Sequence, residues 1–306
     1  KISAVDPGFH TRAPMPLDPK AANGPYGPPR EIAWDSTKSL LYALSVGAGV
    51  TDPTGFELDF TTENSKGVSQ KALPTQLIVL GEGHIPPYGT FDRTFELHGE
   101  QHFTLHRPLS VKGQAVARTR IAELVDKGKD AVAYIETSVT DPEGRPWWTA
   151  TRVSFMRREG GFGGHRGTSS AWRRPDRPAD AVASFTTRAD QALLYRLNED
   201  RNPLHSDPAF AQAAGYGKPI LHGKCTFGIT GRLLLHAVCG SDPTRLRSMG
   251  GQFRSPVVPG ETVTVHAWTD GEDVLFQTRV GDRVVLDRGV LKRSGGDGGD
   301  GPPSRL

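Results

Sequence analysis

The chain has 306 residues, of which 36% are hydrophobic and 23% are charged, and it carries a formal net charge of +3. This length predicts two domains of roughly 130 to 150 residues each, and the composition is that of an ordinary globular protein. The small net charge, without a clustered basic run, argues against a nucleic-acid partner, and no apolar run approaches the ~20 residues that a membrane span requires.

The first part of the chain is expected to form an arm and then a domain with one helix and several strands. Residues 1–30 are rich in Pro and Gly and predict an extended arm on the surface. The first domain, 31–158, opens at Asp35, a good helix N-cap before the apolar stretch LLYAL at 40–44. Segments rich in Val, Thr and aromatic residues then predict strands at 101–106, 114–125, 130–139 and 147–156.

The second part repeats this order. A glycine-rich linker at 159–180 leads to a second domain at 181–293, and the stretch LLYRL at 193–197 takes the place of LLYAL. This match indicates an internal duplication. Four more strands are predicted at 249–255, 262–268, 273–279 and 283–292, and residues 294–306 are expected to be a disordered tail. One helix followed by antiparallel strands, occurring twice, predicts an α+β fold.

A short loop in the second half carries two proton-handling side chains. Asp200 and His205 lie on a segment that Pro203 keeps from being helical, and Asn202 between them adds an amide that can orient water. Gly223 follows at the start of a long apolar helical stretch, where a bare backbone N–H can face a ligand. An acid, a base and an oxyanion donor are three parts of an active site, so the pattern predicts an enzyme.

Two other patterns offer alternative sites. His98, His102 and His106 would share one face of a helix and imitate a metal site, but the surrounding residues predict a strand, which distributes side chains over two faces. The glycines at 160–164 resemble a phosphate cradle, but they lack the passage from strand to helix that such a loop needs. We therefore expect no metal site and no phosphate loop here.

Both halves of the chain resemble a known family. The stretch YRLNEDRNPLHSDPAFAQAAGYGKPILHGKCTFG at 195–228 is similar to the signature of the MaoC-like hydratase 2 family. These are (R)-specific enoyl-CoA hydratases with a double hotdog fold, and they include the hydratase portion of peroxisomal multifunctional enzyme type 2. LHGEQHFTLHRPL at 97–109 and GQFRSPVVPGET at 251–262 resemble other segments of the family in the same order.

The resemblance implies that each half is a hotdog, a long helix wrapped by a curved antiparallel sheet. The second half would carry the chemistry, and the first half would bind the acyl chain of a coenzyme A thioester. The family's catalytic groups fall on Asp200, Asn202, His205 and Gly223. Its substrate contacts fall on His98, Gly99, Lys127, Asp200, Arg201, Asn202, Pro203, Leu204, His205, Gly223 and Phe253. No metal or redox cofactor is required, and the family commonly forms homodimers.

Three residues depart from the family's pattern. The family has a small residue and then Gly before the aspartate, whereas this chain has Asn198 and Glu199, which places a second carboxylate beside Asp200. Lys224 stands where an apolar residue commonly follows His-Gly, and it puts a cation near the expected oxyanion site. No catalytic group is lost, so the resemblance implies reversible hydration of trans-2-enoyl-CoA to (3R)-3-hydroxyacyl-CoA.

Two other functions and two locations stay open. The same residues run in reverse would make a 3-hydroxyacyl-carrier-protein dehydratase of lipid or polyketide synthesis, and a chain without turnover would be an acyl-CoA-binding protein. The N-terminus lacks the apolar core of a signal peptide, which favours a cytoplasmic location. The alternative is the peroxisome, because Ser304-Arg305-Leu306 resembles a C-terminal peroxisomal address.

Overall fold

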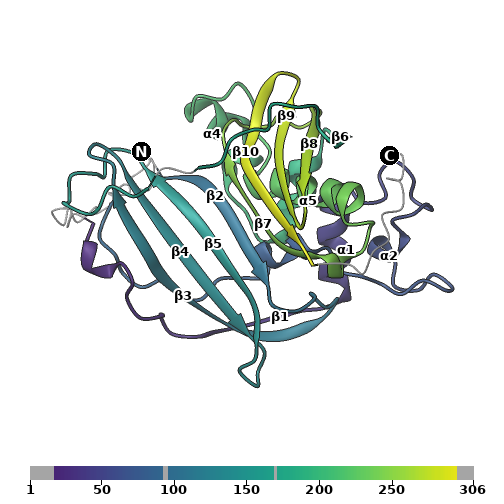
Figure 1. Ribbon diagram of the computed structural model, residues 1–306, viewed down its shortest axis with the longest axis horizontal. Coiled ribbons are helices and arrows are strands. Elements are labelled where there is room, and N and C mark those ends of the chain that lie inside the picture. Colours follow the sequence, from purple (N-terminus) through teal and green to yellow (C-terminus); the bar gives the residue numbers. More distant parts are fainter. Residues whose placement is uncertain (1–16, 92–95, 169–170, 295–306) are drawn as a thin grey trace, which may run out of the picture.

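The computed structural model describes residues 17–91, 96–168 and 171–294. Ten antiparallel strands form one continuous sheet in the order β1-β3-β4-β5-β2-β7-β10-β9-β8-β6 (Figure 1). The strands are β1 Arg30–Trp34, β2 Glu96–Leu105, β3 Gly113–Asp126, β4 Ala131–Thr140, β5 Pro146–Met156, β6 Ala181–Thr186, β7 Leu246–Phe253, β8 Thr262–Asp270, β9 Asp273–Val280 and β10 Arg283–Arg293. The predicted α+β class is confirmed.

The sheet consists of two halves with the same topology. In each half the first strand lies at the outer edge and the second strand lies at the seam, so β1-β3-β4-β5-β2 is repeated as β6-β8-β9-β10-β7. The seam is the pair β2 and β7, where residues 100–104 oppose residues 252–248. In Figure 1 the strands β3, β4 and β5 of the first half lie on the left, and β8, β9 and β10 of the second half lie on the right. The repeated order supports the duplication that the two leucine-rich stretches indicated.

All eight predicted strands are present, with ends that differ from the predicted bounds by a few residues. The two strands at the sheet edges, β1 and β6, were not predicted. They have five and six residues, which is too short for the alternation of apolar and polar side chains to stand out from the neighbouring loops.

Short helices and one long helix complete the fold. The α-helices are α1 Ser36–Ser45, α2 Leu58–Thr61, α3 Gln191–Tyr195, α4 Pro208–Ala213 and α5 Gly223–Val238. The 3₁₀ turns are η1 Pro19–Ala21, η2 Pro74–Val79, η4 Arg196–Asn198, η5 Pro203–His205 and η6 Pro243–Arg245. The carboxylate of Asp35 accepts the Lys38 N–H and caps α1, as predicted. Within the described ranges, no helix is long and apolar enough to cross a membrane.

The first half lacks the long helix that the resemblance implied. α5 in the second half is 16 residues long, whereas η2, at the matching place in the first half, has only six residues. Gly81, Gly83 and the pair Pro86-Pro87 follow η2. Glycine loses much conformational entropy in a helix and proline lacks the N–H that a helix needs, so the helix does not continue. The sheet of the first half is therefore covered by η2 and irregular chain rather than by a long helix.

α5 packs against both halves. A Cβ on Gly228 would lie 2.6 Å from the Tyr42 hydroxyl, and a Cβ on Gly231 would overlap the side chain of Thr75. Since Tyr42 and Thr75 belong to the first half, these two glycines allow the first half to approach the helix closely. One core cluster accordingly includes buried residues of both halves.

A buried ionic network fixes the end of α5 to the first half. The Arg232 guanidinium donates to both carboxylate oxygens of Glu57, at 2.9 and 3.0 Å, and to the Val46 carbonyl oxygen at 3.0 Å. Nε2 of His236 lies 2.9 Å from the same carboxylate. Burial alone would raise the pKa of Glu57, but the hydrogen bond to His236 and the charge of Arg232 outweigh burial and lower this pKa to about 2. The network keeps a buried carboxylate charged.

The glycine-rich linker binds a carboxylate of this chain. The backbone N–H groups of Gly161, Gly128 and Gly163 donate to Asp126 at the end of β3 and lower the pKa of its carboxyl to about 2. The glycines therefore do cradle an anion, but the anion is Asp126 rather than a phosphate.

The arm, the linker and the tail are described only in part. Residues 17–29 run along the first half, where Leu17 is buried and the Gly27 N–H donates to the Thr119 carbonyl oxygen at 2.8 Å. Residues 1–16 of the predicted arm, 169–170 of the linker and 295–306 of the predicted tail lie outside the described residues. The last of these ranges includes the tripeptide that resembles a peroxisomal address.

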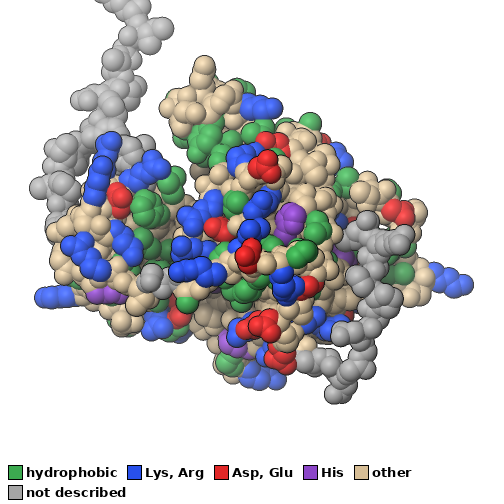
Figure 2. Space-filling model, turned by 45° about the horizontal axis from the view of Figure 1, so that its top comes forward, with side chains coloured by type: hydrophobic (Ala, Val, Ile, Leu, Met, Phe, Trp, Pro, Cys, Tyr) green, Lys and Arg blue, Asp and Glu red, His purple; other side chains and the backbone are tan. Residues whose placement is uncertain are grey.

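The charged side chains are distributed over both halves. Figure 2 shows Lys and Arg spread over one face of the molecule and interspersed with Asp and Glu. This distribution is consistent with the formal net charge of +3. It differs, on the face shown, from the concentrated basic stripe that is typical of a nucleic-acid-binding domain.

The buried network predicts a large effect on stability. Arg232→Met should lower the free energy of unfolding by about 3–5 kcal/mol, because it leaves the buried Glu57 carboxylate without its guanidinium partner. Urea denaturation followed by tryptophan fluorescence measures the change. Arg188→Met is the control, since the pair of Arg188 with Asp190 is exposed and such pairs are worth less than about 1 kcal/mol. Equal stability of the two variants would contradict the role assigned to the network.

Candidate active site

The start of the predicted catalytic loop is tied to both halves. Asn198 is buried, and its side-chain amide donates to the Ser45 hydroxyl at 2.8 Å and to the Tyr195 carbonyl oxygen at 3.0 Å. The next residue, Glu199, has a φ of +76°, which lies in the left-handed region that favours glycine. This bend directs the chain into the loop that begins at Asp200.

Asn202 fixes the turn that carries His205. Its Oδ1 accepts the Leu204 N–H at 3.0 Å and so caps η5. Oδ1 of Asp200 in turn accepts the Asn202 N–H at 3.4 Å, which forms a second local turn. The structure thus gives Asn202 a positioning role, while its predicted role in orienting water stays a prediction.

His205 presents one free ring nitrogen. The ring is buried, and Nδ1 lies 2.9 Å from the Ile220 carbonyl oxygen. Because a carbonyl oxygen only accepts, Nδ1 carries the hydrogen and Nε2 keeps its lone pair. Burial lowers the pKa of His205, and this effect outweighs the opposing effects of the Ile220 hydrogen bond and the Asp200 charge. His205 is therefore a neutral base at neutral pH.

A second histidine, His222, lies against the first. The two ring centroids are 3.7 Å apart and the ring planes are inclined by 30°. Nε2 of His222 donates to the Asp200 carbonyl oxygen at 3.2 Å, whereas Nδ1 is buried without a hydrogen-bond partner in the part of the chain that the structure describes. Burial and the neighbouring His205 lower the pKa of His222 to about 4. Sequence reasoning assigned this residue no role, and its signal there was its place directly before Gly223.

Asp200, His205 and His222 offer donor atoms that all lie within 4.8 Å of one another. A carboxylate and two imidazoles form a donor set that zinc and similar ions accept. Nδ1 of His205 and Nε2 of His222 already contact carbonyl oxygens, so an ion could use only the other nitrogen of each ring. That the reaction needs no metal stays a prediction.

The alternative histidine cluster is not formed. His98 and His102 lie on β2 and His106 follows that strand directly, as the strand prediction required. Nε2 of His102 lies 2.8 Å from the Glu100 carboxylate, and Nε2 of His106 lies 3.1 Å from the Thr149 hydroxyl. Among the described residues these three histidines do not gather as metal ligands.

Gly223 lies at the first position of α5. The N-cap residue, His222, makes no side-chain cap, so the first N–H groups of the helix are left for a ligand or water. A Cβ on Gly223 would lie 3.4 Å from the ring of Phe253, and the glycine therefore keeps the space in front of that ring open. This geometry fits the predicted oxyanion donor.

His98 of the first half lies beside Phe253 of the second half. Their ring centroids are 4.9 Å apart in an edge-to-face contact. Burial lowers the pKa of His98 well below its usual value, and the charges of Lys224 and Arg152 act in the same direction. Gly99 follows at a bulge in β2, where a Cβ would crowd the backbone of β5. The structure thus joins two predicted substrate contacts from different halves.

Lys127 lies apart from this cluster. It is exposed at the turn between β3 and β4, and its ammonium donates to the Arg166 carbonyl oxygen at 2.9 Å. The described contacts do not join it to the catalytic loop. Of the remaining predicted contacts, Arg201 and Pro203 are exposed on that loop and Leu204 is half-buried.

Comparison with known proteins agrees with this geometry. Residues 33–158 match the MFE-2 hydratase 2 N-terminal domain, and residues 170–288 match the MaoC like domain. The chain is 41% identical over 292 residues to 3-hydroxyacyl-thioester dehydratase Y of Mycobacterium tuberculosis. The aligned residues cover 91% of this chain and 99% of that protein. The chain belongs to the MaoC-like hydratase 2 family.

Two further family members are similar over most of the chain. Enoyl-CoA hydratase ChsH3 of Mycobacterium tuberculosis is 41% identical over 287 residues, covering 90% of this chain and 98% of that protein. The crystal structure of a MaoC-like dehydratase from Phytophthora capsici has 30% identity and a TM-score of 0.79, covering 90% of this chain and 97% of the other. The predicted double hotdog fold is confirmed, with the long helix missing from the first half.

Two departures from the family's pattern have a structural explanation. Glu199 takes the place of the family's glycine at a positive φ, and its carboxylate is 58% exposed and pairs with Lys38 at 2.7 Å. It therefore forms no buried carboxylate pair with Asp200. The Lys224 ammonium donates to the Ile78 carbonyl oxygen at 3.2 Å, so it joins the start of α5 to η2 in the first half.

The cap at Asn202 predicts a modest effect on stability. Asn202→Ala should lower the free energy of unfolding by about 1 kcal/mol, because the Leu204 N–H loses its acceptor. Asn202→Asp keeps an acceptor oxygen and should stay close to the wild type. Thermal unfolding of the three proteins at one pH measures the difference, and an equal loss in both variants would show that the oxygen does not cap η5.

Proposed function

We propose that this protein is an (R)-specific 2-enoyl-CoA hydratase, which adds water reversibly to trans-2-enoyl-CoA and forms (3R)-3-hydroxyacyl-CoA. One observation carries the proposal: His205 is fixed through Nδ1, which leaves Nε2 to take a proton, and a ring nitrogen of His205 lies within 4.8 Å of a carboxylate oxygen of Asp200. Together with the uncapped start of α5, these groups supply the base, acid and oxyanion donor that hydration of an unsaturated thioester requires. The 3R configuration follows from the family resemblance.

In the hydration direction, Nε2 of His205 takes a proton from water while the water oxygen forms a bond to C3. The π electrons of the C2–C3 bond move toward the thioester, and negative charge develops on its carbonyl oxygen. The Gly223 N–H donates to that oxygen, and one such donor is typically worth about 3 kcal/mol in the transition state. As the enolate collapses, C2 takes the proton that His205 received from water, and the Asp200 carboxylate relays it, so both catalytic groups return to their starting states. The free Nε2 supports His205 as the base over the reverse assignment.

The names of relatives support both directions of this equilibrium. One is called an enoyl-CoA hydratase and another a 3-hydroxyacyl-thioester dehydratase. Removal of water from a 3-hydroxyacyl thioester uses the same groups in reverse. The homodimer and the cytoplasmic location suggested by the resemblance and the sequence stay predictions.

The acyl group would extend into the first half. A pocket lies there between η2 and the sheet, in the region that a long helix covers in the second half. Its apolar lining consists of Leu77, Ile78, Ile135, Trp148 and Ala150. The space between these side chains is about 10 Å³, room for about one water-sized group, so an alkyl chain would lie along this apolar wall rather than fill a preformed cavity.

Replacing either catalytic side chain should remove most of the turnover. His205→Ala and Asp200→Ala should each lower kcat for crotonyl-CoA hydration by at least ~100-fold. Loss of the enoyl-thioester absorbance measures the rate, and chiral chromatography gives the configuration at C3. His106→Ala is the matched control, because His106 is exposed and contacts Thr149 rather than the loop. Wild-type turnover in a folded His205→Ala protein, or a 3S product, would contradict the proposal.

The lowered pKa of His205 predicts the acid side of the pH profile. His205 acts as a base when neutral, and a pKa below the usual 6.5 keeps it neutral in mildly acidic solution. The decline of kcat/KM for crotonyl-CoA on the acid side should therefore have its midpoint below pH 6.5. A midpoint at or above pH 6.5 would show that the buried ring does not behave in this way.

The lowered pKa of His222 predicts the pH dependence of stability in the same range. Between pH 6.5 and about 4 the unfolded chain binds a proton at His222 that the folded chain does not bind. The free energy of unfolding should therefore fall as the pH falls through this range. Denaturation curves at several pH values measure it, and a constant free energy would contradict the shift.

A further inference from the structure

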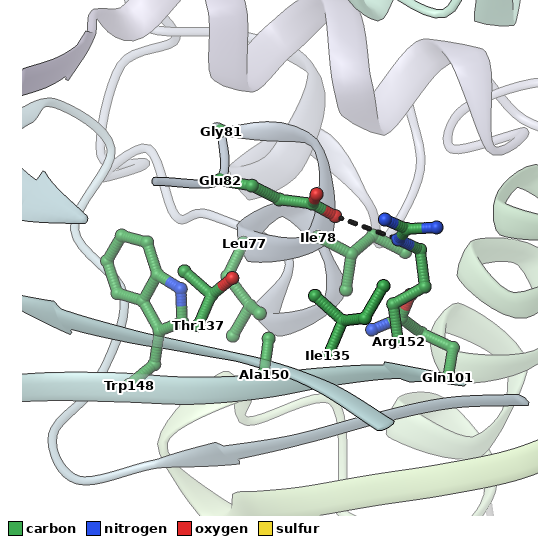
Figure 3. Close-up of a pocket in the computed structure, with 10 residues that line it drawn as sticks. All are labelled: Leu77, Ile78, Gly81, Glu82, Gln101, Ile135, Thr137, Trp148, Ala150 and Arg152. Carbon is green, nitrogen blue, oxygen red and sulfur yellow. Dashed lines mark ion pairs between the residues drawn. The ribbon is translucent and has the colours of Figure 1, made fainter. Parts of the chain in front are cut away.

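The pocket in the first half has polar as well as apolar walls. Four of its lining residues are polar: Glu82, Gln101, Thr137 and Arg152. In Figure 3, Glu82 and Arg152 extend toward each other above the apolar side chains and are joined by an ion pair. A pocket for an unsubstituted alkyl chain gains nothing from such groups, because covering a charged pair with hydrocarbon removes its hydration without replacing it.

The pocket begins beside the reaction centre. Ile78 lines the pocket, and its carbonyl oxygen accepts the ammonium of Lys224, the residue directly after Gly223. His98 packs against Phe253, which faces Gly223, and it pairs across the sheet with Ser154, whose hydroxyl accepts from Arg152. An acyl chain whose thioester binds at Gly223 would pass His98 and reach the polar wall of the pocket, which has room for about one water-sized group.

Two of the four polar side chains already have hydrogen-bond partners within the protein. The Thr137 hydroxyl lies 2.9 Å from the Thr119 hydroxyl. The Gln101 amide donates to the carbonyl oxygens of His102 and Thr151, at 3.3 Å each. These side chains therefore have partners within the sheet, and the ion pair is left as the polar feature that a ligand can use.

The ion pair is loose on one side. Nε of Arg152 lies 3.5 Å from Oε1 of Glu82, which exceeds the ~2.7–2.9 Å of a charge-assisted hydrogen bond. On its other side Arg152 is held by Glu96 at 3.3 Å and by the Ser154 hydroxyl at 2.9 Å. The Glu82 side chain is 34% exposed, and its carboxylate accepts no hydrogen bond among the described residues. A fixed guanidinium thus faces a carboxylate with unused capacity.

A substrate group between these two residues has to accept from the guanidinium and donate to the carboxylate. A hydroxyl group does both, whereas a carboxylate would be repelled by Glu82 and an ammonium by Arg152. We propose that the acyl group of the preferred substrate carries a hydroxyl, which Glu82 and Arg152 bind in the pocket. This inference rests on the proposed hydratase function and names the substrate class of that same site.

The test compares matched substrates. Pairs of trans-2-enoyl-CoA thioesters of equal chain length, one with a methyl end and one with a terminal hydroxyl, are measured over several chain lengths. At the length that brings the hydroxyl to the ion pair, kcat/KM should be about tenfold higher for the hydroxylated member, which is the effect of one hydrogen bond to a charged group. No preference at any length would overturn the proposal.

Substitution of Glu82 tests the residue itself. Glu82→Leu should reduce the ratio of kcat/KM values between the two members to about 1, while Glu82→Gln, which keeps an acceptor oxygen, should retain part of the preference. Glu31→Leu is the matched control, because Glu31 is an exposed carboxylate on β1 of the same half, and it should keep the wild-type ratio. Should Glu82→Leu fail to fold, Glu82→Gln still decides: a ratio equal to that of the wild type would overturn the role of the carboxylate hydrogen bond.

The two proposals fail in different ways. Absence of turnover on crotonyl-CoA by folded wild-type protein would overturn the hydratase function. Turnover on crotonyl-CoA with no preference for a hydroxyl, or a preference that Glu82→Leu leaves unchanged, would overturn the substrate inference alone and leave water as the partner of the pair.

Discussion

The long helix α5 packs against both halves of this molecule, and the arrangement of the two halves depends on these contacts. α5 faces the catalytic loop at Gly223, and further along it lets the first half approach closely at Gly228 and Gly231. Its last turns hold Glu57 through Arg232 in a buried ion pair. A buried pair of this kind costs desolvation and is weak as a source of net stability, but it strongly penalises any arrangement that separates its members. The place of the Gly223 N–H, the proposed oxyanion donor, therefore depends on packing at the opposite end of the same helix.

The chemistry of the site depends on keeping imidazoles neutral. Two rings with centroids 3.7 Å apart cannot both be positively charged without strong repulsion, and burial penalises the charged form of each. The hydrogen bond of His205 to Ile220 then decides which nitrogen of the base is free. A neutral base with a fixed tautomer is prepared before substrate binds, and no proton has to be lost first. The same burial makes the fold sensitive to acid, because the unfolded chain accepts protons that His222 in the folded chain does not.

Local signals in the sequence were enough for much of the fold and for the core of the site. Asp35 as an N-cap, the eight longer strands and the loop from Asp200 to His205 each have a pattern within a few residues. What could not be predicted depends on contacts between distant segments. The stacking of His222 and the hydrogen bond from Lys224 to Ile78 appear only when the loop, α5 and η2 come together. The resemblance implied a long helix in the first half, and this prediction is wrong, because Gly81, Gly83 and the pair Pro86-Pro87 follow η2.

The starts of η2 and α5 occupy matching places in the two halves but differ in the groups that they present. Leu73 and His222 are the N-cap residues of η2 and α5, and their backbones are alike, with φ and ψ of −69° and 129° against −57° and 136°. Pro74 follows the first and Gly223 follows the second. Proline has no N–H, so the first half lacks, at this place, the backbone donor that we propose as the oxyanion donor of the second half. Leu73 also stands where the second half has His222, so this end of the first half has neither the imidazole nor the backbone donor of the proposed site. In place of a long helix, the first half has η2 and a small pocket between η2 and the sheet, with room for about one water-sized group.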